Sequence, residues 1–223
     1  MSALLRPRLD ADRAGWLRIS TVLLLAYVVL TATAYAAHSL YMHAWLPLLA
    51  REIDWLLAPM GFARKTLELV TEHGEQLISL DALATKPISY RHSVPPARIP
   101  VFFATTLQAY ALLHPAVIYS ILIAWPAQSL RERSSMLAWG LPCVVITTSL
   151  DVPFVLTGMI RTTVLERYAP ERLAYDPLVV YSEFLHRGGR LGLAIAAACV
   201  VALVAGRFSR ARMDQSPLAE TGS

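Results

Sequence analysis

Ionisable side chains within apolar runs are the first candidates for chemistry in this sequence. Asp151 and Arg161 lie near the two ends of the stretch LDVPFVLTGMIR, and His114 lies in the middle of another apolar run. A charge within a membrane-spanning segment is costly and often marks a functional site. We therefore interpret Asp151 as a functional or partner-binding residue. For His114 a hydrogen bond to a neighbouring helix is the simpler explanation.

Helical spacing places further polar groups beside these residues. Residues three or four positions apart share one side of a helix, so Thr147 and Thr148 lie on the side of Asp151. A later run begins with EFLHRGGR, in which His186 and Arg190 are four residues apart. Three segments could thus bring polar groups to one place in the outer half of a membrane. The same spacing relates Thr106, Tyr110 and His114.

A purely structural role for these groups is the competing interpretation. Threonine, tyrosine and histidine within membranes often form hydrogen bonds between helices and only hold a bundle together. Arg161, His186 and Arg190 are also typical of residues at a membrane boundary.

The composition indicates the elements that would hold these residues. Of the 223 residues 56% are hydrophobic and 16% are charged, whereas a soluble domain has about 45–50% and about 25%. An integral membrane protein is therefore expected. The net charge of +4 comes with arginines beside apolar runs and without a basic, aromatic patch, so no nucleic-acid partner is expected. Cys143 and Cys199 lack metal-ligand or disulfide spacing, so neither a metal nor another cofactor is predicted.

The hydropathy pattern predicts an all-α fold with about four transmembrane helices and a small helical region outside the membrane between the first two. A cleaved signal peptide is the alternative for the first span. The later spans are expected at 100–127, 136–160 and 191–206. The predicted organisation is a basic cytoplasmic tail (1–18), an anchor (19–37), an extracytoplasmic amphipathic region (38–99), a three-helix membrane domain (100–206) with loops at 128–135 and 161–190, and a cytoplasmic tail (207–223).

Two stretches of the 38–99 region are predicted as helices. LPLLAREIDWLLAPMGF has apolar residues at helical spacing, typical of a helix lying on a membrane surface. ARKTLELVTEHGEQLISL is interpreted as a second helix that weakens at Gly74. The following stretch is rich in proline and is expected to be extended.

Arginines beside the spans predict the orientation. They precede the first span, occupy the short loop RERSS and follow the last span. With four spans all three groups lie on one side, which places both termini in the cytoplasm and the protein in the inner membrane. The five arginines of the 161–190 connection weaken this signal.

The order of these segments resembles the exosortase/archaeosortase family of membrane-embedded protein-sorting enzymes. Arg161 in TGMIR matches the arginine position of that family, and His186 in FLHRGG matches its histidine. The resemblance implies catalytic roles for both, together with a cysteine near the outer end of the second span. Here that stretch is VFFATTLQAY, without a cysteine, and a threonine hydroxyl needs an adjacent base to act as a nucleophile.

The missing cysteine favours a non-catalytic accessory protein of exosortase-type sorting and envelope export, such as an exosortase H-associated membrane protein. Its expected partners are the lipid bilayer and an exosortase-like enzyme or a sorting-tail substrate. One alternative is a transpeptidase or protease with an atypical nucleophile. A second is a transporter component that uses Asp151 and His114, although the sequence has no inverted repeat.

Overall fold

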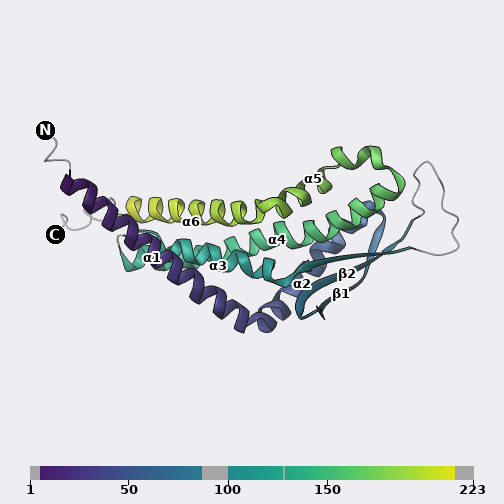
Figure 1. Ribbon diagram of the computed structural model, residues 1–223, viewed down its shortest axis with the longest axis horizontal. Helices are drawn as coiled ribbons and strands as arrows, with labels where there is room; N and C mark the ends of the chain where they lie inside the picture. Colours follow the sequence, from purple (N-terminus) through teal and green to yellow (C-terminus); the bar gives the residue numbers. More distant parts are fainter. Residues whose placement is uncertain (1–5, 87–99, 128, 214–223) are drawn as a thin grey trace, which may run out of the picture.

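The computed structural model describes residues 6–86, 100–127 and 129–213 (Figure 1). The described chain is elongated. Helices α1 (Arg6–Ala36), α3 (Gln108–Ala124), α4 (Leu130–Tyr168) and α6 (Arg190–Met213) form a bundle at one end, and a small sheet covered by α2 (His38–Leu57) lies at the other. Shorter pieces join α4 to α6: η2 (Pro170–Tyr175), α5 (Pro177–Phe184) and the kinked segment η3 (Leu185–Gly189), in which Arg187 and Gly188 have non-helical backbone angles.

The structure is 77% helical, and three of its described helical segments are long and apolar enough to cross a membrane: Gly15–Ala36, Leu130–Tyr168 and Pro177–Arg207. These features agree with a membrane protein. Apolar side chains such as Leu24 and Leu25 are largely exposed along α1, as expected for a surface that lipid covers. Helix α3 is apolar but shorter than these three, so a count of four spans stays a prediction.

The prediction of an entirely helical fold is wrong for the region after α2. Strands β1 (Phe62–Glu72) and β2 (Glu75–Ala84) pair in antiparallel fashion where a second helix was expected. The two residues between them, His73 and Gly74, both have positive φ angles of 52° and 84°. This combination is typical of a tight hairpin turn, which glycine favours. The hairpin therefore replaces the helix that the apolar spacing suggested.

Strand β3 (Val101–Leu107) corrects a second prediction. It pairs with β2 and completes a sheet of order β1-β2-β3, so the apolar stretch 100–127 is a strand followed by α3 rather than one long helix. Its burial alternates, with Phe102, Ala104 and Thr106 buried and Phe103 and Thr105 exposed. An alternation with a period of two is the signature of a strand with one covered face.

Helix α4 is longer than predicted at both ends. Ser129 caps its start by accepting a hydrogen bond from the Glu132 amide at 3.1 Å, so most of the expected loop 128–135 is helical. At the other end α4 takes in the start of the expected connection 161–190, and α5 and η3 supply further helix there. Its 39 residues extend about 58 Å, nearly twice the thickness of a hydrocarbon core. Helix α4 therefore extends well beyond the thickness of a single bilayer core.

Two hydrophobic cores meet along α4. One joins the covered face of the sheet to α2 and α4 through residues such as Ile53, Leu80 and Leu156. The other joins α3, α4 and α6 through residues such as Ile118 and Ala198. The shared helix fixes the sheet relative to the bundle. The predicted extended stretch at 87–99 lies outside the described residues.

Candidate functional site

Asp151 is fully buried at the point where α4 passes the start of α3 and α6. Its Oδ2 atom lies 2.9 Å from His114 Nε2, and its Oδ1 atom accepts a hydrogen bond from Arg190 Nε at 2.9 Å. His114 is also fully buried, and Arg190 is only 4% exposed. The carboxylate therefore has a partner at each oxygen, from two different helices.

Arg190 has further contacts on its other side. Its guanidinium carbon lies 4.0 Å from the centre of the Tyr110 ring, and one of its terminal nitrogens lies 3.5 Å from Thr106 Oγ1. A cation over an aromatic face is attracted by the ring quadrupole, most strongly where water is excluded. We call Thr106, Tyr110, His114, Asp151 and Arg190 the Asp151 cluster.

The buried polar atoms without a hydrogen-bond partner among the described residues include His114 Nδ1, Thr148 Oγ1 and Tyr41 Oη. Tyr41 belongs to α2. Burial raises its pKa to about 12. Tyr41 is therefore a neutral hydroxyl at any physiological pH.

The structure brings several predicted residues together. Thr106, Tyr110, His114 and Asp151 belong to one cluster, and Thr148 lies one turn before Asp151 on α4. Thr147 instead donates to carbonyl oxygens of its own helix. A functional role for these residues stays a prediction.

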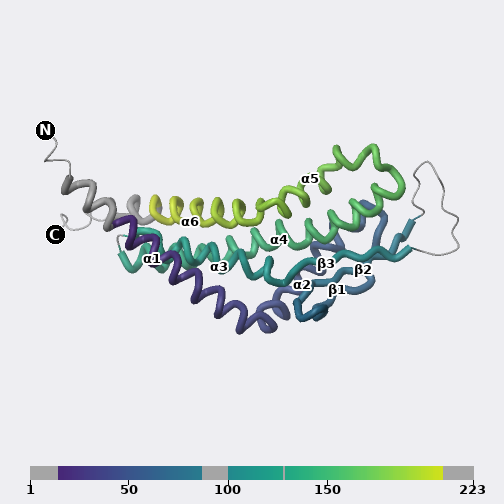
Figure 2. Tube along the Cα trace, in the orientation of Figure 1, coloured from purple at the N-terminus to yellow at the C-terminus, as the bar shows by residue number. Residues whose placement is uncertain are grey.

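Arg190 was not predicted as a site residue, although its position four residues after His186 was noticed. The one sequence signal was an arginine at the start of an apolar run. Its partner 39 residues away follows only from how α4 and α6 pack. Figure 2 shows the region where β3 leads into α3 and where α6 begins, at the sheet end of the bundle.

Arg161 holds the start of α5. Its Nε atom donates to Asp176 Oδ2 at 2.8 Å. Asp176 also caps α5 by accepting from the amides of Leu178 and Val179 at 3.1 and 3.4 Å. Capping satisfies amides that would otherwise lack partners at a helix start. The side chain of Arg161 thus positions α5 against α4.

His186 has a different partner. It belongs to η3, and its Nδ1 atom lies 2.8 Å from the carbonyl oxygen of Ser182. His186 lines an open cleft, whereas Arg161 is not among the described lining residues. The two residues that carry the family resemblance therefore have separate surroundings.

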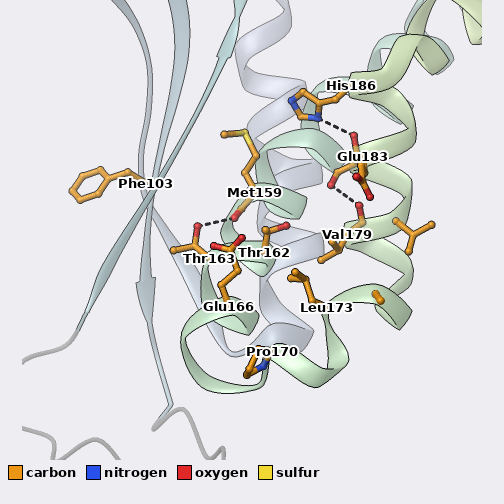
Figure 3. A pocket seen from close by; sticks show the side chains of 13 residues that line it. Phe103, Met159, Thr162, Thr163, Glu166, Pro170, Leu173, Val179, Glu183 and His186 are labelled. Atoms are coloured by element: carbon orange, nitrogen blue, oxygen red, sulfur yellow. Dashed lines mark hydrogen bonds between the residues drawn. The ribbon is translucent and has the colours of Figure 1, made fainter.

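The cleft lies between β3, α4, η2, α5 and η3, and it has a volume of about 730 Å³ (Figure 3). Both apolar and polar side chains line it. We call this space the α4–α5 cleft. Its described lining is Phe103, Met159, Thr162, Thr163, Glu166, Pro170, Leu173, Ala174, Val179, Val180, Ser182, Glu183 and His186.

No thiol lines the α4–α5 cleft among the described residues. Cys143 and Cys199 are free cysteines on α4 and α6, and both are half-buried. Thr106 belongs to the Asp151 cluster, and the Ser182 hydroxyl donates to the Val179 carbonyl at 2.9 Å. Within the described ranges no group of three or more histidine, cysteine or acidic residues could hold a metal ion.

Comparison of the chain with protein-family models, with curated proteins and with solved structures gives no match.

Proposed function

We propose that this chain is a multi-pass inner-membrane accessory protein of exosortase-type protein sorting and envelope export, with both termini in the cytoplasm. Its bundle anchors the sheet and the α4–α5 cleft outside the membrane. There the cleft contacts a sorting enzyme or the tail of an exported protein. The role is a contact role rather than a catalytic one.

The cleft is the observation that carries this proposal. It combines apolar walls with a polar border, as protein-binding surfaces often do, and it lies beside the sheet (Figure 3). A catalytic role would need a nucleophile activated by His186. Ser182 also lines the cleft, but its hydroxyl proton is used in a bond to its own helix and the side chain is only 5% exposed.

The proposed topology follows from charges and aromatic residues. Trp16 and Tyr35 are 71% and 72% exposed near the two ends of the apolar surface of α1. They are 19 residues apart, about 28 Å along a helix, which is the thickness of a hydrocarbon core. Tryptophan and tyrosine are enriched at both boundaries of a membrane. Because arginines precede Trp16, that end is assigned to the cytoplasm.

Site-specific photocrosslinking in cells that contain a sorting system tests the proposal. A benzophenone amino acid in place of Phe103, which lines the cleft, is expected to give a discrete adduct with a sorting enzyme or a sorting tail. The same amino acid in place of Tyr175 is the control, because Tyr175 is also largely exposed, at 84% against 66% for Phe103, but does not line the cleft. Equal adducts from both positions, or none from Phe103, would contradict the contact role.

Replacement of His186 separates the accessory role from the enzyme alternative. In His186→Ala an accessory protein is expected to retain most sorting, whereas an enzyme that uses this histidine as its base loses at least about a hundredfold in rate. Accumulation of unprocessed substrate, measured at equal levels of membrane-inserted protein, distinguishes the two. Complete loss of sorting would favour a transpeptidase or protease.

A further inference from the structure

The hydroxyl groups that line the α4–α5 cleft already donate hydrogen bonds within the protein. Thr162, Thr163 and Ser182 each donate to a carbonyl three or four residues earlier in their own helix, at 2.9, 3.0 and 2.9 Å. A hydroxyl has one proton and two lone pairs. Their oxygen atoms can therefore only accept further hydrogen bonds.

His186 presents an acceptor to the cleft in the same way. The carbonyl of Ser182 can only accept, so Nδ1 carries a proton, and in the neutral form of the ring Nε2 is an acceptor. Figure 3 shows this bond and the neighbouring Glu183 at the same end of the cleft.

Two carboxylates complete the polar wall, and no lysine or arginine occurs among the described lining residues. Glu166 and Glu183 are both exposed. Arg187 pairs with one oxygen of Glu183 from outside the lining, which leaves further acceptor capacity on that carboxylate. The cleft therefore has an excess of acceptors, and its negative charge is that of Glu166, since Arg187 balances the charge of Glu183.

The remaining wall is apolar and borders a strand. Met159, Leu173 and Val179 provide aliphatic surface, and Phe103 comes from β3. Among the described strands β3 is an end strand that pairs with β2 alone. The edge of a sheet is a common binding site for an extended peptide, whose main chain bonds to the strand while alternate side chains enter pockets.

We propose that the α4–α5 cleft binds an extended peptide segment in which lysine or arginine residues alternate with apolar residues. Both cationic side chains are donors without an acceptor, which complements the acceptor wall. An acidic segment would place its carboxylates against Glu166 and Glu183. The inference deepens the proposed function, since it states the chemistry of the segment that the cleft contacts.

Fluorescence anisotropy with the purified full chain in phosphatidylcholine nanodiscs tests this proposal. The probe is the labelled, end-blocked peptide GLKVKLVG, whose two lysines lie on one face of an extended chain, compared with the same peptide carrying glutamate or norleucine in place of both lysines. The lysine peptide is expected to bind about tenfold more tightly than either, as two partly exposed ion pairs would provide. Its affinity should fall at high salt.

Variants of the carboxylates locate the binding. The double variant Glu166→Gln/Glu183→Gln is expected to reduce the affinity for the lysine peptide about tenfold. Glu171→Gln is the matched control, because Glu171 is exposed on η2 but does not line the cleft. Circular dichroism of each variant verifies the fold.

Several results would overturn the proposal: similar affinity for all three peptides, no binding of the lysine peptide, an equal loss in Glu171→Gln, or tight binding of spermine, which would indicate a site for small cations. The sorting role and the peptide specificity of the cleft are contradicted by different results. Peptide binding without a Phe103 adduct in cells would contradict only the sorting role, whereas an adduct without preference for the lysine peptide would contradict only this inference.

Discussion

The Asp151 cluster and the α4–α5 cleft use the same residue types in opposite ways. In the cluster the carboxylate of Asp151 has a partner at each oxygen, and Arg190 has an anion, an aromatic face and a hydroxyl around it. In the cleft the carboxylates, the histidine and the hydroxyls all offer acceptors, and no cationic side chain lies among the described lining residues.

The contrast shows which of the two regions still has unused hydrogen-bonding capacity for a ligand. Burying an ion pair costs solvation, so the partners must match closely and removal of one leaves an uncompensated charge. An exposed excess of acceptors costs little folding free energy, because water molecules donate hydrogen bonds to it. A ligand with hydrogen-bond donors can replace that water. The cluster therefore has the properties of a structural element and the cleft those of a contact surface.

Asp151→Asn is expected to have the largest effect. It leaves the cation of Arg190 buried without its anion, at a cost of about 3–5 kcal/mol in unfolding free energy. Unfolding of the purified protein in detergent, followed by tryptophan fluorescence, measures the loss. The double variant Asp151→Asn/Arg190→Met should recover part of it. An unchanged unfolding midpoint in Asp151→Asn would contradict a structural role of the Asp151 cluster.

Gly158→Ala tests the wall of the cleft itself. A Cβ at Gly158 would lie 2.4 Å from Ser182 Cβ and 3.2 Å from the backbone oxygen of Leu178, so α5 must move away from α4. We expect a loss of about 1–3 kcal/mol together with weaker peptide binding. Gly192→Ala is the control, because nothing lies within 4 Å of its added Cβ. Equal stability of the two variants would contradict close packing here.

Asp176→Ala removes both the cap of α5 and the partner of Arg161. The expected loss is about 1–2 kcal/mol, typical of a helix cap. Asp176→Asn keeps a good capping side chain without the charge, so it should lose less. Thermal unfolding of both variants separates the cap from the ion pair. If the asparagine variant loses as much as the alanine variant, the ion pair dominates.

Arg64→Gln should have the smallest effect. Arg64 binds Asp54 through two hydrogen bonds of 2.8 and 2.9 Å, between β1 and α2. The hydrogen bond with Asp54 raises the pKa of Arg64, so the guanidinium stays charged at any working pH. Because the pair is partly exposed, we expect a loss of at most about 1 kcal/mol that shrinks with added salt. A loss equal to that of Asp151→Asn would show that burial does not distinguish the two pairs.

Part of the fold could be predicted and part could not. The apolar runs of α1, α4 and α6 were recognisable because a spanning helix needs about 20 apolar residues. The hairpin was missed because its apolar residues also fit a helical pattern. Its signal was the pair His73–Gly74, with two positive φ angles at a turn. Strand β3 was missed because it continues directly into α3 without a polar boundary.

The candidate site divides in the same way. Helical spacing correctly placed Thr148 beside Asp151 and related Tyr110 to His114, because neighbours within one helix follow from its geometry. Pairing between elements does not follow from spacing. The family resemblance implies catalytic roles for Arg161 and His186 in the enzyme alternative, and in the structure the two side chains bind different partners, Asp176 and Ser182.

The sequence alone determined that this chain is rich in apolar helix and that a few charges must lie inside or beside it, since composition and periodicity are local properties. Only the tertiary structure decided which charges meet. Arg190 reaches Asp151 because α4 and α6 pack side by side, and the acceptors of the cleft face one space because η2 turns the chain back along α4. Side chains from distant segments find each other through packing, and packing is a property of the whole chain.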